Sequence, residues 1–139
     1  MALSFVRNNI TLDTANLLAT AAIEHAREIG AKMVVAVVDT GGHLVALKRD
    51  DNAFAASVSI ATDKAITGAT FGLSTDDLCN ALKSSPTALD GISRRPNTIM
   101  FGGGYPIILN GEVIGGIGVS GGSEDQDREC AQKALEKLN

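Results

Sequence analysis

Aromatic residues are scarce in this sequence. It contains no tryptophan, one tyrosine and four phenylalanines, which is 4% of its 139 residues. A core without large rings has to be built from alanine, valine, isoleucine and leucine, and 45% of the chain is hydrophobic. Small side chains favour close packing of helices on a sheet and close contacts between subunits. The length fits one domain, residues 1–139, with no room for a second core.

Cysteine and histidine are equally sparse. Cys79 and Cys130 have no CxxC spacing, and each falls on an expected helix. Two small buried thiols are therefore expected, and a thiolate nucleophile is the minor alternative. With only His25 and His43 in the chain, a closed zinc site is not expected. His25 lies on the apolar face of a helix, which favours a packed residue over a ligand.

The charge pattern excludes two classes of partner. The chain has 12 basic and 16 acidic residues and a net charge of −4, without the clustered lysines and arginines of a nucleic-acid surface. No apolar run reaches the roughly 18 residues of a membrane span. Residues 1–9 lack the regions of a signal peptide, so a cytoplasmic protein is expected.

Caps, periodicity and glycines predict an alternation of helices and strands. Thr11 caps the first helix, and Ser123 with Gln126 forms a capping box at the start of the last one. Residues 33–38 form a β-branched run that should be a central strand. Residues 84–97, with two prolines, are expected to be a long loop. The expected helices are 11–29, 53–71, 74–83 and 124–138, and the expected strands include 31–39, 43–49, 98–101 and 112–120.

The least ordinary stretch is the glycine-rich segment 101–122. Asn110-Gly111 between two apolar runs predicts a hairpin with a type I′ turn. On the returning strand, Gly116, Gly118 and Ser120 share one face, which is nearly bare backbone. Such a face indicates that a helix packs closely on the strand or that a ligand approaches it, with the helix favoured.

Two further features could bind an anion. Gly102, Gly103 and Gly104 leave backbone N–H groups open to an anion, or they form a sharp bend between strands. Arg94 and Arg95 carry the densest positive charge of the chain. They suit a carboxylate or a propionate, or the acids of a neighbouring subunit.

Lys64 lies on a helix rich in small residues and requires an acid or an anionic ligand if it is buried. The alternatives are a surface lysine or one paired with Asp63 or Asp39. Asp39 and His43 flank a tight turn, where the carboxylate could orient the ring and raise its basicity. The candidate site therefore combines Asp39, His43 and Lys64 with Gly102, Gly103, Gly104, Arg94 and Arg95.

Three stretches together resemble the GlcG/HbpS-like family, which includes the C-terminal domain of PduO-type proteins. They are FGGGYPIILNGEVIGGIGVSGGSEDQD at residues 101–127, VDTGGHL at 38–44 and DKAIT at 63–67. The resemblance covers nearly the whole chain in matching order. It implies an α+β fold with a five-stranded antiparallel sheet of profilin-like type flanked by helices. It also implies homo-oligomers, from dimers up to octamers.

Three functions stay open. The resemblance favours binding of haem or a related tetrapyrrole, with His43 as the candidate axial ligand to the metal and Lys64 or the arginines at the propionates. The second is an enzyme for a small carboxylate, acting by proton transfer, hydrolysis or deamination, in which His43, Asp39 and Lys64 move protons and the glycine amides hold an oxyanion. The third is an accessory oligomeric subunit without chemistry of its own.

Overall fold

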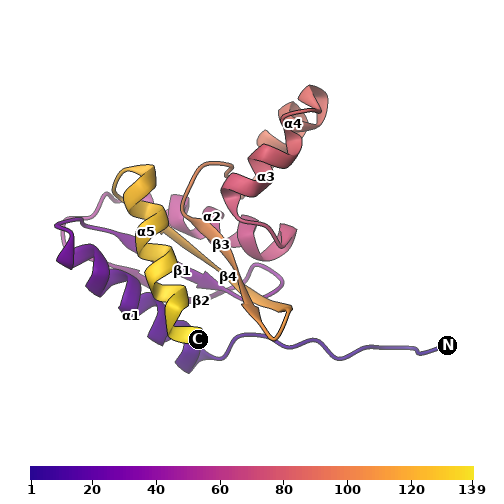
Figure 1. Ribbon diagram of the computed structural model, residues 1–139, viewed down its shortest axis with the longest axis horizontal. Coiled ribbons are helices and arrows are strands. Elements are labelled where there is room, and N and C mark those ends of the chain that lie inside the picture. Colours follow the sequence, from indigo (N-terminus) through magenta and orange to yellow (C-terminus); the bar gives the residue numbers. More distant parts are fainter.

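The computed structural model describes residues 1–139 and contains one antiparallel sheet in the strand order β2–β1–β4–β3. Helices cover both faces of this sheet, as Figure 1 shows. In chain order the elements are α1 (Leu12–Glu28), β1 (Val34–Val38), β2 (Leu44–Arg49), α2 (Ser57–Phe71), α3 (Thr75–Leu82), α4 (Pro86–Ser93), β3 (Gly104–Leu109), β4 (Glu112–Ser120), α5 (Glu124–Leu135) and the short 3-10 helix η1 (Glu136–Leu138).

The central strand β1 is buried along its whole length, and its alternate residues serve two cores. Val35 and Val37 join the larger core, formed with α1, α5 and the other three strands. Val34, Ala36 and Val38 face α2 on the opposite side of the sheet. A strand between two helical layers has no polar face, which explains the continuous β-branched run in the sequence.

The bare face of β4 is covered by α2, so the helix interpretation of the glycines is confirmed. A Cβ on Gly118 would meet the backbone carbonyl oxygen of Ala61, and a Cβ on Gly116 would meet that of Ala65. Any larger side chain at either position would hold the helix off the sheet. This close approach sets the height of α2, and therefore of Lys64, above the strands.

The local signals in the sequence are also confirmed. Asn110 and Gly111 both have positive φ, 52° and 78°, as a type I′ turn between β3 and β4 requires. Thr11 and Ser123 cap α1 and α5 through their side chains, and Gln126 completes a capping box with Ser123.

The prediction of five strands is wrong, because residues 98–101 do not join the sheet. Side chains take the backbone donors of this segment and its neighbour: Ile99 N donates to Thr67 Oγ1, and Gly102 N donates to Glu124 Oε1. The segment therefore lies against α2 and α5. The loop prediction for 84–97 is also wrong in part, since Pro86 begins the helix α4.

Two parts of the chain extend away from the layers (Figure 1). The pair α3 and α4 projects from the end of α2, and α4 has no buried residue. The N-terminal segment is extended and exposed as far as Asn9, and hydrogen bonds between Asn8 and Glu112 and between Asn9 and Thr40 attach it to the body. No helix is both long and apolar enough to cross a membrane.

Candidate functional site

The residues predicted to form one site lie in two separate polar clusters, with Arg94 and Arg95 apart from both. The first is the β1–β2 turn, which carries Asp39 and His43. The second surrounds Lys64, between α2, β4 and α5. No hydrogen bond or ion pair joins the two clusters.

In the turn, one oxygen of Asp39 organises the whole loop. Asp39 Oδ1 accepts hydrogen bonds from the backbone N–H groups of Gly41 and His43, both at 2.9 Å, and lies 3.1 Å from His43 Nδ1. These bonds to its charged form lower the pKa of Asp39 despite the cost of partial burial. The ionised carboxylate can only accept, so it holds the proton on Nδ1. His43 Nε2 is left without a partner on a side chain that is 80% exposed.

Contacts on two sides hold this turn in place. Thr40 donates to Asn9 Oδ1 through both its N–H and its hydroxyl group, at 2.9 and 2.7 Å. The α-carbon of Gly42 faces Ile66 and Thr70 on α2 so closely that an added Cβ would lie 3.3 and 3.4 Å from them. The turn is therefore fixed to the N-terminal segment and to α2, while the His43 side chain projects outwards.

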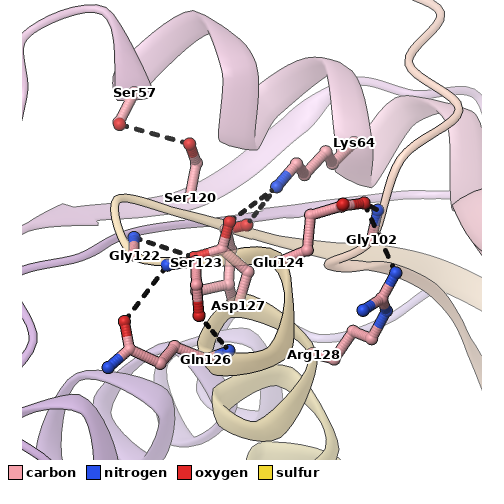
Figure 2. Close-up of polar contacts among 12 residues, drawn as sticks. Ser57, Lys64, Gly102, Ser120, Gly122, Ser123, Glu124, Gln126, Asp127 and Arg128 are labelled. Atoms are coloured by element: carbon pink, nitrogen blue, oxygen red, sulfur yellow. Dashed lines mark hydrogen bonds and ion pairs between the residues drawn. The ribbon is translucent and has the colours of Figure 1, made fainter.

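Lys64 is the centre of the second cluster, and its side chain is fully buried. Figure 2 shows it pointing towards α5, where Nζ donates to Asp127 Oδ2 and to the carbonyl oxygen of Val119, both at 2.9 Å. The ring of Phe101 lies 4.9 Å from Nζ and covers the remaining side. The expectation that a buried lysine requires an acid is confirmed, but the acid is Asp127 and not Asp63 or Asp39.

Burial shifts both members of this ion pair towards their neutral forms. It lowers the pKa of Lys64 and raises the pKa of Asp127, and in each case the partner's charge opposes the shift. Asp127 Oδ1 also accepts from Gly122 N at 3.0 Å. Lys64 is consequently enclosed by groups of its own chain and does not face solvent.

The triglycine loop has internal partners as well. Gly102 N donates to Glu124 Oε1 at 2.9 Å, and Gly104 N donates to Thr75 Oγ1 at 3.1 Å. The anion at Gly102 is thus the chain's own carboxylate, as Figure 2 shows. For Gly102 and Gly104 to hold a ligand, it would have to displace Glu124 and Thr75.

Arg128 connects this loop to the projecting helices. Its guanidinium binds both oxygens of Asp76 on α3, at 2.7 and 2.8 Å, and approaches Glu124 at 3.3 Å. The bidentate pair lowers the pKa of Asp76. Arg128 therefore ties α3 to α5 beside Gly102.

The two arginines after α4 have different partners, and only Arg95 contacts the C-terminal end of α2. Arg94 binds Asp90 of its own helix at 3.1 Å and is 76% exposed. The guanidinium of Arg95 lies 5.7 Å from the centre of the Phe71 ring. Since Gly42 packs on Thr70, Arg95 and the histidine turn flank the same last turn of α2.

The remaining candidates are structural. Cys130 is buried in the core, which raises the pKa of its thiol to about 12, and Cys79 is half-buried. His25 is 16% exposed and lies near Glu28 and Glu129, in agreement with the expected packed residue.

The surface has two hollows, and neither is lined by Asp39, His43 or Lys64. The larger, about 360 Å³, lies between α1 and the end of β2 and includes Arg27, Lys48 and Asp50.

Sequence reasoning missed the acid that pairs with Lys64. Asp127 is 63 residues away from it along the chain, at the end of the stretch 101–127 that resembles the family. The capping box at Ser123 was a usable signal, because it fixes the helix start and places Asp127 on the first turn facing inwards. Asp76 and Arg128 had no such signal.

Comparison with known proteins identifies the family. The sequence profile described as "Haem degrading protein HbpS-like" matches residues 10–136. The chain belongs to the HbpS-like family. A 15.0 kDa protein encoded between dhaT and dhaS in Citrobacter freundii is 40% identical over 129 residues, which cover 91% of this HbpS-like chain and 90% of that protein.

Two solved structures share the fold of this HbpS-like chain. Klebsiella pneumoniae ORFY superposes with a TM-score of 0.92 at 36% identity, covering 99% of this chain and 96% of the other. A PduOC–haem complex superposes with a TM-score of 0.85 at 32% identity, covering 94% and 96%. These comparisons support the α+β fold with an antiparallel sheet and a link between the family and haem.

Proposed function

We propose that this chain binds haem or a related tetrapyrrole and that His43 is the axial ligand to its metal. The observation that carries the proposal is the state of the His43 ring: Nδ1 is held by an ionised carboxylate and Nε2 is free on an exposed side chain. Histidines that ligate metals usually donate their other ring N–H to a carboxylate or a carbonyl group, which fixes the ring and raises its basicity. The Asp39–His43 pair has this form.

The surroundings of His43 also suit a macrocycle. Leu44 is 54% exposed beside it, and Ile66 contributes a partly buried apolar side chain from α2. Arg95, at the same end of α2, could pair with a propionate. Bound haem would supply a redox-active iron, and the protein's own part would be to hold the ring, cover one apolar edge and balance the propionate charge.

This arrangement favours binding over proton-transfer chemistry on a small carboxylate. An enzyme of that kind would need His43 and Lys64 on one substrate, whereas Lys64 is enclosed between Asp127, Val119 and Phe101. A PduOC structure contains haem, and that protein is similar to this chain over nearly its full length.

The test is a titration of the purified protein with haem, followed by absorbance, on the parent, His43→Ala and His25→Ala. His25 is the matched control, since it is the other histidine and lies packed against α1 and α5. We expect saturable binding near one haem per chain, at least about 10-fold weaker in His43→Ala and unchanged in His25→Ala. Non-saturating binding, or equal affinity in both variants, would contradict the proposal.

A further inference from the structure

We propose that Gly41 is a positioning residue for the His43 ring: the missing side chain at position 41 leaves the space in which the ring lies on Asp39. The inference rests on the proposed function, since it concerns how the same ligand is aimed. A Cβ built on Gly41 would lie 2.7 Å from His43 Cε1 and 2.9 Å from Nδ1. Both distances are shorter than two such atoms can approach, so the ring and a methyl group cannot share this place.

The backbone gives Gly41 no other reason to be glycine. Its φ is not in the left-handed region, whereas the neighbouring Gly42 has a φ of 82°. An alanine at position 41 would therefore fit the backbone without strain, in contrast to one at position 42. The constraint at position 41 comes from the ring alone.

The turn around the ring cannot move aside to relieve the contact. Thr40 is bound twice to Asn9, Gly42 packs against α2, and Asp39 accepts from the backbone at two points. The His43 side chain, in contrast, is 80% exposed, so its ring has room to turn away from Asp39 into solvent. An added methyl group should displace the ring away from Asp39 and leave the fold unchanged.

Displacement of the ring has a chemical consequence. The hydrogen bond from Nδ1 fixes the proton on that nitrogen and leaves Nε2 as the metal-binding atom. Once the ring leaves the carboxylate, both tautomers are populated and Nε2 loses its fixed direction. Loss of such a partner typically lowers metal affinity about 10- to 100-fold. Gly41→Ala should weaken haem binding by about 10-fold although position 41 never touches the ligand.

The experiment compares the full-length parent with Gly41→Ala, His43→Ala and Gly91→Ala. Gly91 is the matched control, because it lies on α4 and a Cβ there would meet nothing within 4 Å. Three quantities are measured: the ¹⁵N chemical shifts of the imidazole nitrogens without haem, the free energy of unfolding in urea, and haem affinity. In Gly41→Ala we expect the Nδ1-protonated pattern to be lost, unfolding unchanged, and haem affinity about 10-fold lower.

The readouts separate this inference from the proposed function. If His43→Ala abolishes haem binding while Gly41→Ala keeps both the parent ring spectrum and the parent affinity, the positioning role is wrong and the proposed function stands. If haem binding does not depend on His43, the proposed function fails, and the ring spectrum without haem still decides the role of Gly41. A loss of unfolding free energy in Gly41→Ala, absent in Gly91→Ala, would show a structural role and overturn the inference.

Discussion

The Lys64–Asp127 ion pair gives the sharpest stability prediction. Lys64 is fully buried and Asp127 nearly so, and each is the other's only opposite charge within hydrogen-bond distance. In Asp127→Asn the lysine would keep only the carbonyl oxygen of Val119 and the Phe101 ring. Breaking a buried pair by removing one partner typically costs about 3–5 kcal/mol, because the other charge stays desolvated.

That loss is large compared with the whole stability of a domain of this size, which is about 5–15 kcal/mol. The double variant Lys64→Met/Asp127→Asn should lose less than Asp127→Asn alone. It removes the uncompensated charge, while the amide oxygen introduced by Asp127→Asn can still accept from Gly122 N. Methionine and asparagine are close in shape to the lysine and aspartate that they replace, so cavity formation contributes little to the loss of stability.

Urea unfolding followed by circular dichroism measures these differences, since chains below about 150 residues usually unfold in two states. Lys83→Met is the control, because Lys83 is exposed and has no acidic partner, and it should change the free energy by less than about 0.5 kcal/mol. The reasoning would be refuted if Asp127→Asn cost less than about 1 kcal/mol, well below the range for a broken buried pair. It would also be refuted if the double variant lost the sum of the two single changes.

Gly118→Ala should lower the free energy of unfolding by about 3 kcal/mol, because its Cβ would meet the backbone of α2 at Ala61 and Ala65. Urea unfolding, with Gly91→Ala as the control variant, tests this. Equal stability of these two variants would show that α2 can lift from the sheet. Hydrogen bonds from Arg27 lower the pKa of Asp50 to about 2 from 3.8, so the stabilisation from this pair is complete above about pH 4 and is lost as the pH falls towards 2. Arg27→Met should therefore flatten the stability–pH curve between about pH 4 and 2, and an unchanged slope would contradict the assignment.

The parts of the fold that could be predicted from the sequence are those set by neighbours along the chain. The hairpin follows from Asn110-Gly111, since few other residues adopt positive φ twice in succession. The helix starts follow from Thr11 and Ser123, whose hydroxyl groups bond to N–H groups three residues away. Gly116 and Gly118 indicated a close helix because their spacing places both on one face of a strand.

The parts that could not be predicted depend on contacts between distant segments. Residues 98–101 have an apolar, β-like sequence, but Thr67 and Glu124 compete successfully for the donors of this segment and Gly102, and no strand forms. Local propensity contains no information about acceptors on other elements. The same limit hid the partner of Lys64: the need for an acid could be inferred from the residue type, but the identity of Asp127 required the packing of α5 on the sheet.

The longest stretch of the family resemblance, residues 101–127, and His43, which carries the proposed function, lie in different parts of this molecule. Gly102 and Gly104 are bound by Glu124 and Thr75, and Gly116 and Gly118 admit α2, so the glycine-rich segment builds the scaffold. Similarity in this segment is therefore informative about the fold and says little about a ligand. The β1–β2 turn, in contrast, uses its hydrogen bonds to hold one exposed ring without enclosing it. A change of one or two residues in that turn could alter the ligand while the sheet, α2 and the buried ion pair stay as they are.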